Sequence, residues 1–224
     1  MAVVICECGT EHADDDPKIR LKKALGLVET AYMIGADIVK FQCFMEGQPL
    51  FCPMQGDAKR WKRWHRTILG VHSWRTVLTA CRDNGMKLVL STFQHKAVDM
   101  CNQYCIPQKV AVRALYSFPY QKANNIFAVS QPKGQNIVSA GKYRLSCAPG
   151  YPCDMKEAVW DGTMDGISDH SGNPFPCVDA LLRGARCVEA HLVVSEDSPD
   201  AKSGMDAEHF KMICEARDAA PLMR

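Results

Sequence analysis

The chain has 224 residues, with 27 Lys and Arg against 25 Asp and Glu, so its formal net charge is only +2. This balance excludes a strongly basic nucleic-acid binder and an acidic tail protein. With 47% hydrophobic and 23% charged residues, the chain can bury a sizeable core, and its composition excludes a disordered protein.

The predicted elements alternate between short β-branched runs and helical patterns, which is typical of βαβ units and a parallel sheet. The predicted strands are residues 2–7, 38–42, 87–92, 109–112, 136–139, 144–147, 166–168 and 187–191. The predicted helices are residues 17–34, 74–84, 97–104 and 119–129. Eight strands with intervening helices indicate an α/β fold, the (β/α)8 TIM barrel, as a single domain over residues 1–224.

The connections after the fifth and sixth strands are short. Residues 140–143 are too few for the crossover that joins parallel strands, which takes about a dozen residues. We therefore expect shortened or missing helices after strands five and six, or an error in the strand count.

The first residues, MAVVICECG, carry no basic region ahead of their short apolar run, so they predict a buried strand and not a secretory signal. No later run approaches the length of a membrane span. The twelve cysteines are scattered and include no C-x-x-C pair, which favours reduced, buried thiols over disulfides or a structural zinc site. We expect a cytoplasmic protein that does not contact a membrane.

Two histidines follow neighbouring predicted strands, His170 after the seventh and His191 at the end of the eighth. In a TIM barrel the active site lies at the C-terminal ends of the strands. A lone histidine there more often has a structural role, but two at matching heights favour one divalent metal with open positions for substrate oxygens.

Two lysines, Lys40 and Lys109, lie within apolar strands. A buried lysine is costly unless it is paired, so an anion such as phosphate is a reasonable partner. The alternative is an internal ion pair with Glu7 or Glu189. Hydroxyl groups that could complete a phosphate cradle belong to Thr92, Ser139 and Ser168.

The segment KRWKRWHR at residues 59–66 is basic and aromatic, a pattern that can bind nucleic acid. However, Trp61, Trp64 and Ile68 recur at helical spacing, which favours a docked helix whose basic side faces water. No nucleic-acid partner is expected.

An ordered series of motifs along the chain resembles the N-acetylneuraminate (sialic acid) synthase family. The matching segments are residues 7–12 (E-x-G-x-N-H), 35–42 (G-A-D-x-V-K-F-Q), 91–92 (the S-T of S-T-P-F), 109–112 (K-I-A-S), 139–141 (S-T-G), 147–152 (C-x-x-x-Y-P), 166–171 (G-x-S-D-H-T), 184–185 (G-A), 189–191 (E-K-H) and 204–206 (G-P-D). A chance match to the whole ordered series is far less plausible than a chance match to any single motif.

The resemblance implies a barrel enzyme, a transferase that condenses phosphoenolpyruvate with an open-chain aldose such as an N-acylhexosamine. The products would be a 2-keto-3-deoxy acid of the nonulosonic type and inorganic phosphate. By position, His170 and His191 would hold a divalent metal, Mn²⁺ or Mg²⁺. The donor would be surrounded by Lys40, Thr92, Lys109, Ser139 and Ser168, and the sugar would face Gln42, Tyr151 and Asp206. Glu7 would orient the attacking water or handle a proton.

The resemblance also allows a homodimer, whereas the family's C-terminal antifreeze-like domain is not expected because the chain ends at Arg224. Several residues depart from the family pattern: Glu11 replaces Asn, Val112 and Ala114 replace a serine and a sugar-binding acidic residue, and Pro149 replaces a polar residue. These departures leave two alternatives open. One is a barrel lyase or aldolase acting on another carbonyl or phosphate substrate, and the other is a non-catalytic binding barrel.

Overall fold

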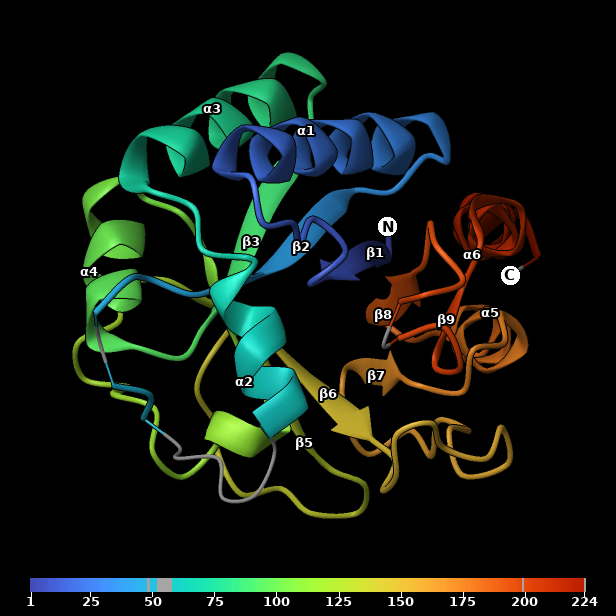
Figure 1. The fold of residues 1–224 in the computed structure, drawn as a ribbon. Helices are drawn as coiled ribbons and strands as arrows, with labels where there is room; N and C mark the ends of the chain where they lie inside the picture. Colours follow the sequence, from blue (N-terminus) through green and yellow to red (C-terminus); the bar gives the residue numbers. More distant parts are fainter. Residues whose placement is uncertain (48, 52–57, 199, 224) are drawn as a thin grey trace.

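The sheet of this protein closes on itself. The computed structural model describes residues 1–47, 49–51, 58–198 and 200–223, with only the backbone of residues 58–60 and 223. Within these residues, strands β1 to β8 pair in parallel in chain order, and β1 (Val3–Gly9) also pairs with β8 (Cys187–Leu192) (Figure 1). The strands between them are β2 (Ile38–Cys43), β3 (Lys87–Thr92), β4 (Gln108–Val110), β5 (Ile126–Pro132), β6 (Tyr143–Cys147) and β7 (Gly166–Asp169). The predicted TIM barrel is therefore confirmed.

The helices cover one side of this barrel more completely than the other (Figure 1). They are α1 (Pro17–Met33), α3 (Val71–Asp83), α4 (His95–Gln103), α5 (Phe175–Leu182) and α6 (Ala207–Ala219), which continues into the 3₁₀ turn η2 (Ala220–Met223). Helix α2 (Ala58–His65) follows β2 and lies across the C-terminal end of the barrel, where the two-residue strand β9 (Gly204–Met205) extends from β8. Among the described helices, none is long and apolar enough to span a membrane.

Helix α1 begins and ends where its sequence signals lie. The side chain of Asp16 caps the first turn by accepting a hydrogen bond from the Lys18 N–H, and Pro17 is the first helical residue. Beyond the end, Gly35 adopts a left-handed φ of 81°. The helix therefore starts and stops as predicted.

The fifth strand lies elsewhere than predicted. Residues 126–132, taken in part as the end of a helix over 119–129, form β5, while the predicted strand at 136–139 is a loop. The run Ile-Phe-Ala-Val is β-branched and aromatic, and it completes the barrel by pairing with β4 and β6. The structure of such a short apolar run depends on its tertiary pairing and not on its local pattern. The predicted helix at residues 119–129 and the predicted strand at residues 136–139 were both wrong.

The expectation of missing helices is confirmed. No helix lies in the described segments 133–142 and 148–165, which connect β5 to β6 and β6 to β7, and only the 3₁₀ turn η1 (Val112–Ala114) lies between β4 and β5. An aromatic cluster of Phe44, Trp64, Phe93 and Phe118 packs with Leu115 near this side of the barrel. Loops and this cluster replace the missing helical layer.

The inside of the barrel is built in layers because side chains alternate along each strand. Ile5, Ile38, Val89 and Leu145 form an apolar plug with Cys187. Two positions further along four of these strands, the residues are polar: Glu7, Lys40, Ser91 and Glu189. The apolar plug thus supports a polar layer at the C-terminal end.

Gly166 is required where β7 and β8 approach closely, because a Cβ at this position would lie 1.6 Å from the Cys187 carbonyl oxygen. We expect Gly166→Ala to lower the free energy of unfolding by about 3 kcal/mol or more. Gly26→Ala is the matched control, since a Cβ there meets nothing within 4 Å and α1 should gain about 0.5–1 kcal/mol. Denaturant titration of both variants measures the difference; equal stabilities would contradict this packing.

His12 couples stability to pH. Its ring is buried beside Phe41 and Trp74, its Nε2 lies 3.0 Å from the Thr67 carbonyl oxygen, and burial lowers its pKa from 6.5 to about 4. Between these two values the unfolded chain binds a proton that the folded chain does not, so the stability contributed by neutral His12 is lost as pH falls through this window. The loss approaches about 3 kcal/mol at pH 4.

We expect His12→Gln, which does not titrate in this range, to show a flatter dependence of unfolding free energy on pH between 6.5 and 4 than the parent protein. Urea unfolding at several pH values provides the measurement. Parallel curves for the two proteins would show that His12 does not carry the effect.

Candidate active site

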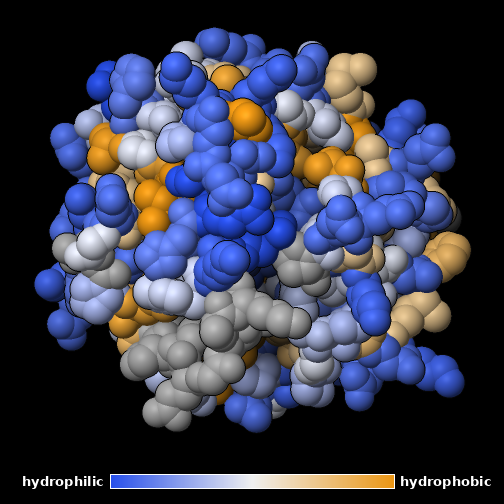
Figure 2. Space-filling view, viewed as in Figure 1, coloured by the Kyte–Doolittle hydropathy of each residue, from blue (hydrophilic) through white to orange (hydrophobic). Residues whose placement is uncertain are grey.

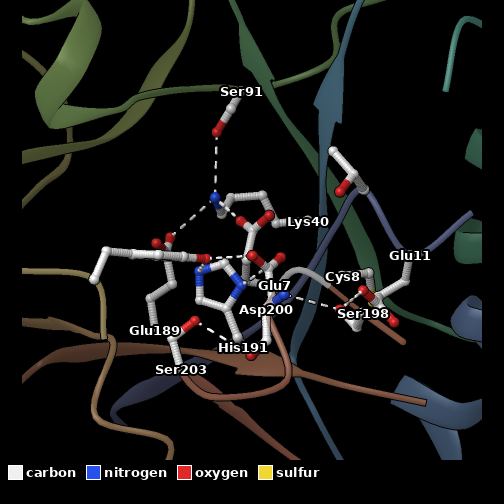
Figure 3. Close-up of polar contacts among 12 residues, drawn as sticks. Glu7, Cys8, Glu11, Lys40, Ser91, Glu189, His191, Ser198, Asp200 and Ser203 are labelled. Carbon is white, nitrogen blue, oxygen red and sulfur yellow. Dashed lines mark hydrogen bonds and ion pairs between the residues drawn. The ribbon is translucent and has the colours of Figure 1, made fainter. Parts of the chain in front are cut away.

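A layer of buried charges fills the C-terminal half of the barrel. Lys40 on β2 forms an ion pair with Glu7 on β1, and its Nζ lies 3.6 Å from Glu189 Oε2 on β8 (Figure 3). Lys109 on β4 donates to Glu189 Oε1 at 2.7 Å. All four side chains are at most 4% exposed. The lysines therefore have the internal partners that the sequence offered as an alternative to an anion.

Hydroxyl groups complete this layer. Ser168 on β7 donates to Glu189 Oε1 at 2.8 Å, and Lys40 donates to the Ser91 hydroxyl at 3.2 Å. Ser130 on β5 is buried, and its hydroxyl has no hydrogen-bond partner. An unpaired buried hydroxyl is available to a ligand.

The charged state of the layer follows from burial and pairing. Burial alone would raise the pKa of Glu189, but Lys109 and Lys40 outweigh it and hold the pKa well below its usual range. Burial lowers the pKa of Lys40 to about 7, against the attraction of Glu189. Lys40 can therefore release its proton near neutral pH, next to the Glu7 carboxylate.

Above the charges lie two imidazoles from adjacent strands. The rings of His170, just after β7, and His191 on β8 have centroids 5.2 Å apart. Burial and the neighbouring His191 lower the pKa of His170 to about 3, so this imidazole is neutral. The Cys147 thiol lies 3.5 Å from His170 Nδ1.

Tyr151 and Asp200 border the histidines. The Tyr151 hydroxyl donates to Asp200 Oδ1 at 2.6 Å and lies 3.4 Å from His191 Nε2. Asp200 Oδ2 lies 3.4 Å from His191 Nδ1, and burial, which would raise the pKa of Asp200, is outweighed by His191 and Tyr151, which hold it well below its usual range. Tyr151 is 43% exposed, so this part of the site is open to solvent.

The donor set fits a divalent metal only in part. The described residues contain no group of three or more His, Cys, Asp or Glu side chains arranged to hold an ion. His170 and His191 can supply two neutral nitrogen ligands, and the buried His191 Nδ1 lacks a well-aligned hydrogen bond. These two residues fit a metal whose remaining positions are filled by water and substrate.

The structure gathers most of the predicted site residues at this end of the barrel. Glu7, Lys40, Lys109 and Ser168 share the charged layer, His170, His191 and Tyr151 lie above it, and Gln42 lies on the same face of β2 as Lys40. Glu189 joins both lysines and was considered only as their structural partner.

Three predicted donor or sugar contacts lie elsewhere. Thr92 donates to Gln108 Oε1 at 3.0 Å, because it is on the opposite face of β3 from Ser91. Strand alternation, counted from Lys40 and its partner Val89, would have selected Ser91. Ser139 is exposed in the β5–β6 loop, and the buried hydroxyl on β5 belongs to Ser130.

Asp206 is the third correction. It is exposed at the start of α6, where its side chain accepts a hydrogen bond from the His209 N–H. Asp200 occupies the site in its place. The signal was present in the sequence, since residues 199–200 are Pro-Asp, the last two letters of the G-P-D motif that was assigned to residues 204–206.

The departures from the family pattern cluster near α2. Val112 and Ala114 form the 3₁₀ turn η1, where Ala114 is fully buried, and the Arg113 guanidinium lies 5.8 Å from the Trp64 ring. The basic segment is helical as predicted, with Trp64 stacked on Phe44 and beside a cavity of about 340 Å³. The side chains of Lys59 and Arg60 lie outside the described residues.

Two curated proteins similar to this chain are named as sugar-acid synthases. The chain is 22% identical to N,N'-diacetyllegionaminic acid synthase of Campylobacter jejuni over 257 aligned positions, covering 95% of this chain and 74% of that protein. It is also 22% identical to a pseudaminic acid synthase of the same species, covering 95% of this chain and 72% of that protein.

A solved structure shares the fold. The sialic acid synthetase of Leptospira borgpetersenii superposes with a TM-score of 0.75 at 15% identity, covering 99% of this chain and 84% of that one. No family model matches the chain. The similarity to these two curated sugar-acid synthases extends over 95% of the chain, in agreement with the resemblance that the motifs predicted.

Proposed function

We propose that this protein condenses phosphoenolpyruvate with an open-chain N-acylhexosamine-like aldose in a metal-dependent reaction, giving a nonulosonic acid and phosphate. One observation carries the proposal. A buried layer of two lysines, two carboxylates and the unpaired hydroxyl of Ser130 lies directly below two imidazoles on adjacent strands. The named sugar-acid synthases among its relatives support the class of product.

The strands would bind the donor. Lys40, Lys109 and Ser168 supply hydrogen-bond donors to phosphate and carboxylate oxygens, and Ser130 supplies a hydroxyl that has no partner in the protein. The two lysines are already neutralised by Glu7 and Glu189. Transfer of an anion into such a neutral, buried layer is costly unless a cation accompanies it.

The histidines would supply the place for that cation. His170 and His191 would hold a divalent ion, which when bound polarises the aldehyde oxygen of the acceptor. The π electrons of the donor double bond would form the bond from the methylene carbon to the aldehyde carbon, and the aldehyde oxygen would take up a proton to become a hydroxyl. Water would add to the donor carbon that bears phosphate and give up one proton. The bond from that carbon to the phosphate oxygen would then break, phosphate would leave, and the added hydroxyl would lose its proton to give the ketone. Glu7, which is ion-paired with Lys40, is placed to accept the proton of that water.

A lyase or aldolase acting on another carbonyl substrate is the second candidate. It is favoured by Val112 and Ala114, which place no polar group where the family has a serine and an acidic residue. Binding of phosphoenolpyruvate without any condensation in a screen of N-acylhexosamines, followed by mass spectrometry, would favour this candidate.

The metal assignment predicts a loss of phosphate release. We expect His170→Ala and His191→Ala each to lower Mn²⁺-dependent phosphate release from phosphoenolpyruvate and acceptor at least about 100-fold, because each removes one of two protein ligands. Isothermal titration should show that donor binding no longer depends on Mn²⁺. His72→Ala, an exposed histidine on α3, is the control. Unchanged rates in both site variants would rule out the assignment.

The donor assignment predicts weaker binding without a lysine. We expect Lys40→Met and Lys109→Met to raise the Kd for phosphoenolpyruvate about tenfold or more, measured by titration calorimetry. Since Lys109→Met removes the nearer of the two lysine partners of buried Glu189 and can cost about 3–5 kcal/mol of stability, Ser168→Ala provides a milder variant with the ion pairs intact. Lys87→Met, exposed at the opposite end of β3, is the control. Parent-like affinity in all three site variants would exclude this layer as the donor site.

A further inference from the structure

Glu11 is a buried carboxylate at the junction of three segments. It lies in the loop after β1, and its side chain is 2% exposed. It accepts a hydrogen bond from the Ser198 hydroxyl (Figure 3) and a longer one, 3.5 Å, from the Val194 N–H. On its other side, Arg63 Nη2 of helix α2 lies 3.5 Å away.

The contact with α2 is reinforced by the neighbouring residue. Arg63 Nε donates to Thr10 Oγ1 at 2.7 Å, and Nη2 donates to the Thr10 carbonyl oxygen at 3.1 Å. The guanidinium therefore contacts two consecutive residues of the loop after β1: it hydrogen-bonds to Thr10 and forms an ion pair with Glu11. In the space-filling view, α2 forms a hydrophilic strip across the face above the barrel (Figure 2). Arg63 is the described side chain that ties this strip to the β1 loop.

On the opposite side, the contacts lead toward the histidines. The Ser198 hydroxyl that donates to Glu11 also accepts a hydrogen bond from the Asp200 N–H at 3.0 Å. Asp200 in turn accepts from the Tyr151 hydroxyl and lies beside His191. A continuous series of polar contacts thus joins α2 to the residues above the charged layer.

Because the Glu11 carboxylate is buried, its contacts with Ser198, Val194 and Arg63 affect its stability in the folded protein. Burial raises the pKa of Glu11, and the hydrogen bonds from Ser198 and Val194, together with the charge of Arg63, only partly offset this shift. A carboxylate held away from water depends on its hydrogen-bond and charged partners, so the loss of any one contact is costly at that contact.

We propose that Glu11 is a positioning residue, which joins the loop of Asp200 to helix α2 and so holds Asp200, and through it the Tyr151 hydroxyl, in place above the donor layer. This inference rests on the proposed function, in which that region receives the acceptor sugar. The acceptor half of the site is then complete only while α2 is docked on the barrel. The family pattern has Asn at this position, so the ionic link to Arg63 is a feature of this chain.

Amide hydrogen exchange tests the link without any substrate. We expect Glu11→Ala to raise exchange at least about tenfold both in α2 and in residues 194–200, since both segments lose an anchor. Ser198→Ala should loosen residues 194–200 alone, and Arg63→Met should loosen α2 alone. Glu196→Ala, an exposed carboxylate in the same loop, is the matched control. Unchanged exchange in the loop of Glu11→Ala would overturn the proposal.

Kinetics test the consequence for the reaction. We expect Glu11→Ala to raise the acceptor KM at least about tenfold while the Kd for phosphoenolpyruvate stays within about twofold of the parent value. Glu11→Gln, which keeps an acceptor for Ser198, should recover part of the loss. An equal loss of donor affinity would contradict a role confined to the acceptor half.

The proposed function and the positioning role of Glu11 can be disproved independently of each other. If the parent protein performs no condensation, the proposed function is wrong, and the exchange experiment alone decides whether Glu11 joins the two segments. If Glu11→Ala does not fold, Ser198→Ala and Arg63→Met still test whether Glu11 joins the two segments. Each variant removes a different contact of Glu11, the first with Ser198 and the second with Arg63. Loosening that spreads from either variant to both segments would show that Glu11 is not the junction.

Discussion

The buried pairing of two lysines with two carboxylates governs the chemistry that this barrel can perform. Lys40 and Lys109 meet Glu7 and Glu189 at the barrel axis, in a place that is almost closed to water. Such a layer is stable only when its charges balance, since an unpaired ion there costs several kcal/mol. An incoming anion therefore arrives favourably only with a compensating cation. The two imidazoles lie directly above the layer, and under the proposed function they would hold that cation, so that donor binding and metal binding would be linked.

The strands that carry this layer were largely readable from the sequence, because buried parallel strands appear as short apolar runs with a polar residue near their C-terminal ends. It was harder to assign which face of its strand each residue lies on. Thr92 and Ser91 are adjacent, and only the pairing of β2 with β3 shows that Ser91 points to Lys40. The fifth strand was missed for a related reason, since Ile126 to Val129 is apolar in either structure and its pairing with β4 and β6 is not encoded locally.

The loops above the strands were predicted less well than the strands themselves. Asp206 follows a glycine and begins a helix, so it resembles a motif residue while serving as an N-cap. Asp200, which contacts Tyr151 and His191, is placed by a loop whose conformation depends on Ser198 and Glu11. Such contacts join segments that are 187 residues apart in the sequence, as between Glu11 and Ser198, and no local pattern specifies them.

The two halves of the site therefore rest on different kinds of structure. Hydrogen-bonded strands fix the donor layer, and the apolar plug formed by Ile5, Ile38 and Val89 supports it from below. The acceptor half depends on loops, on α2 and on an aromatic cluster that takes the place of helices after β4, β5 and β6. A change in a loop alters local contacts without moving the strands, whereas a change in the layer disturbs balanced buried charges. In the proposed reaction, the barrel would thus constrain the donor chemistry, and the acceptor would be the component that this chain is free to change.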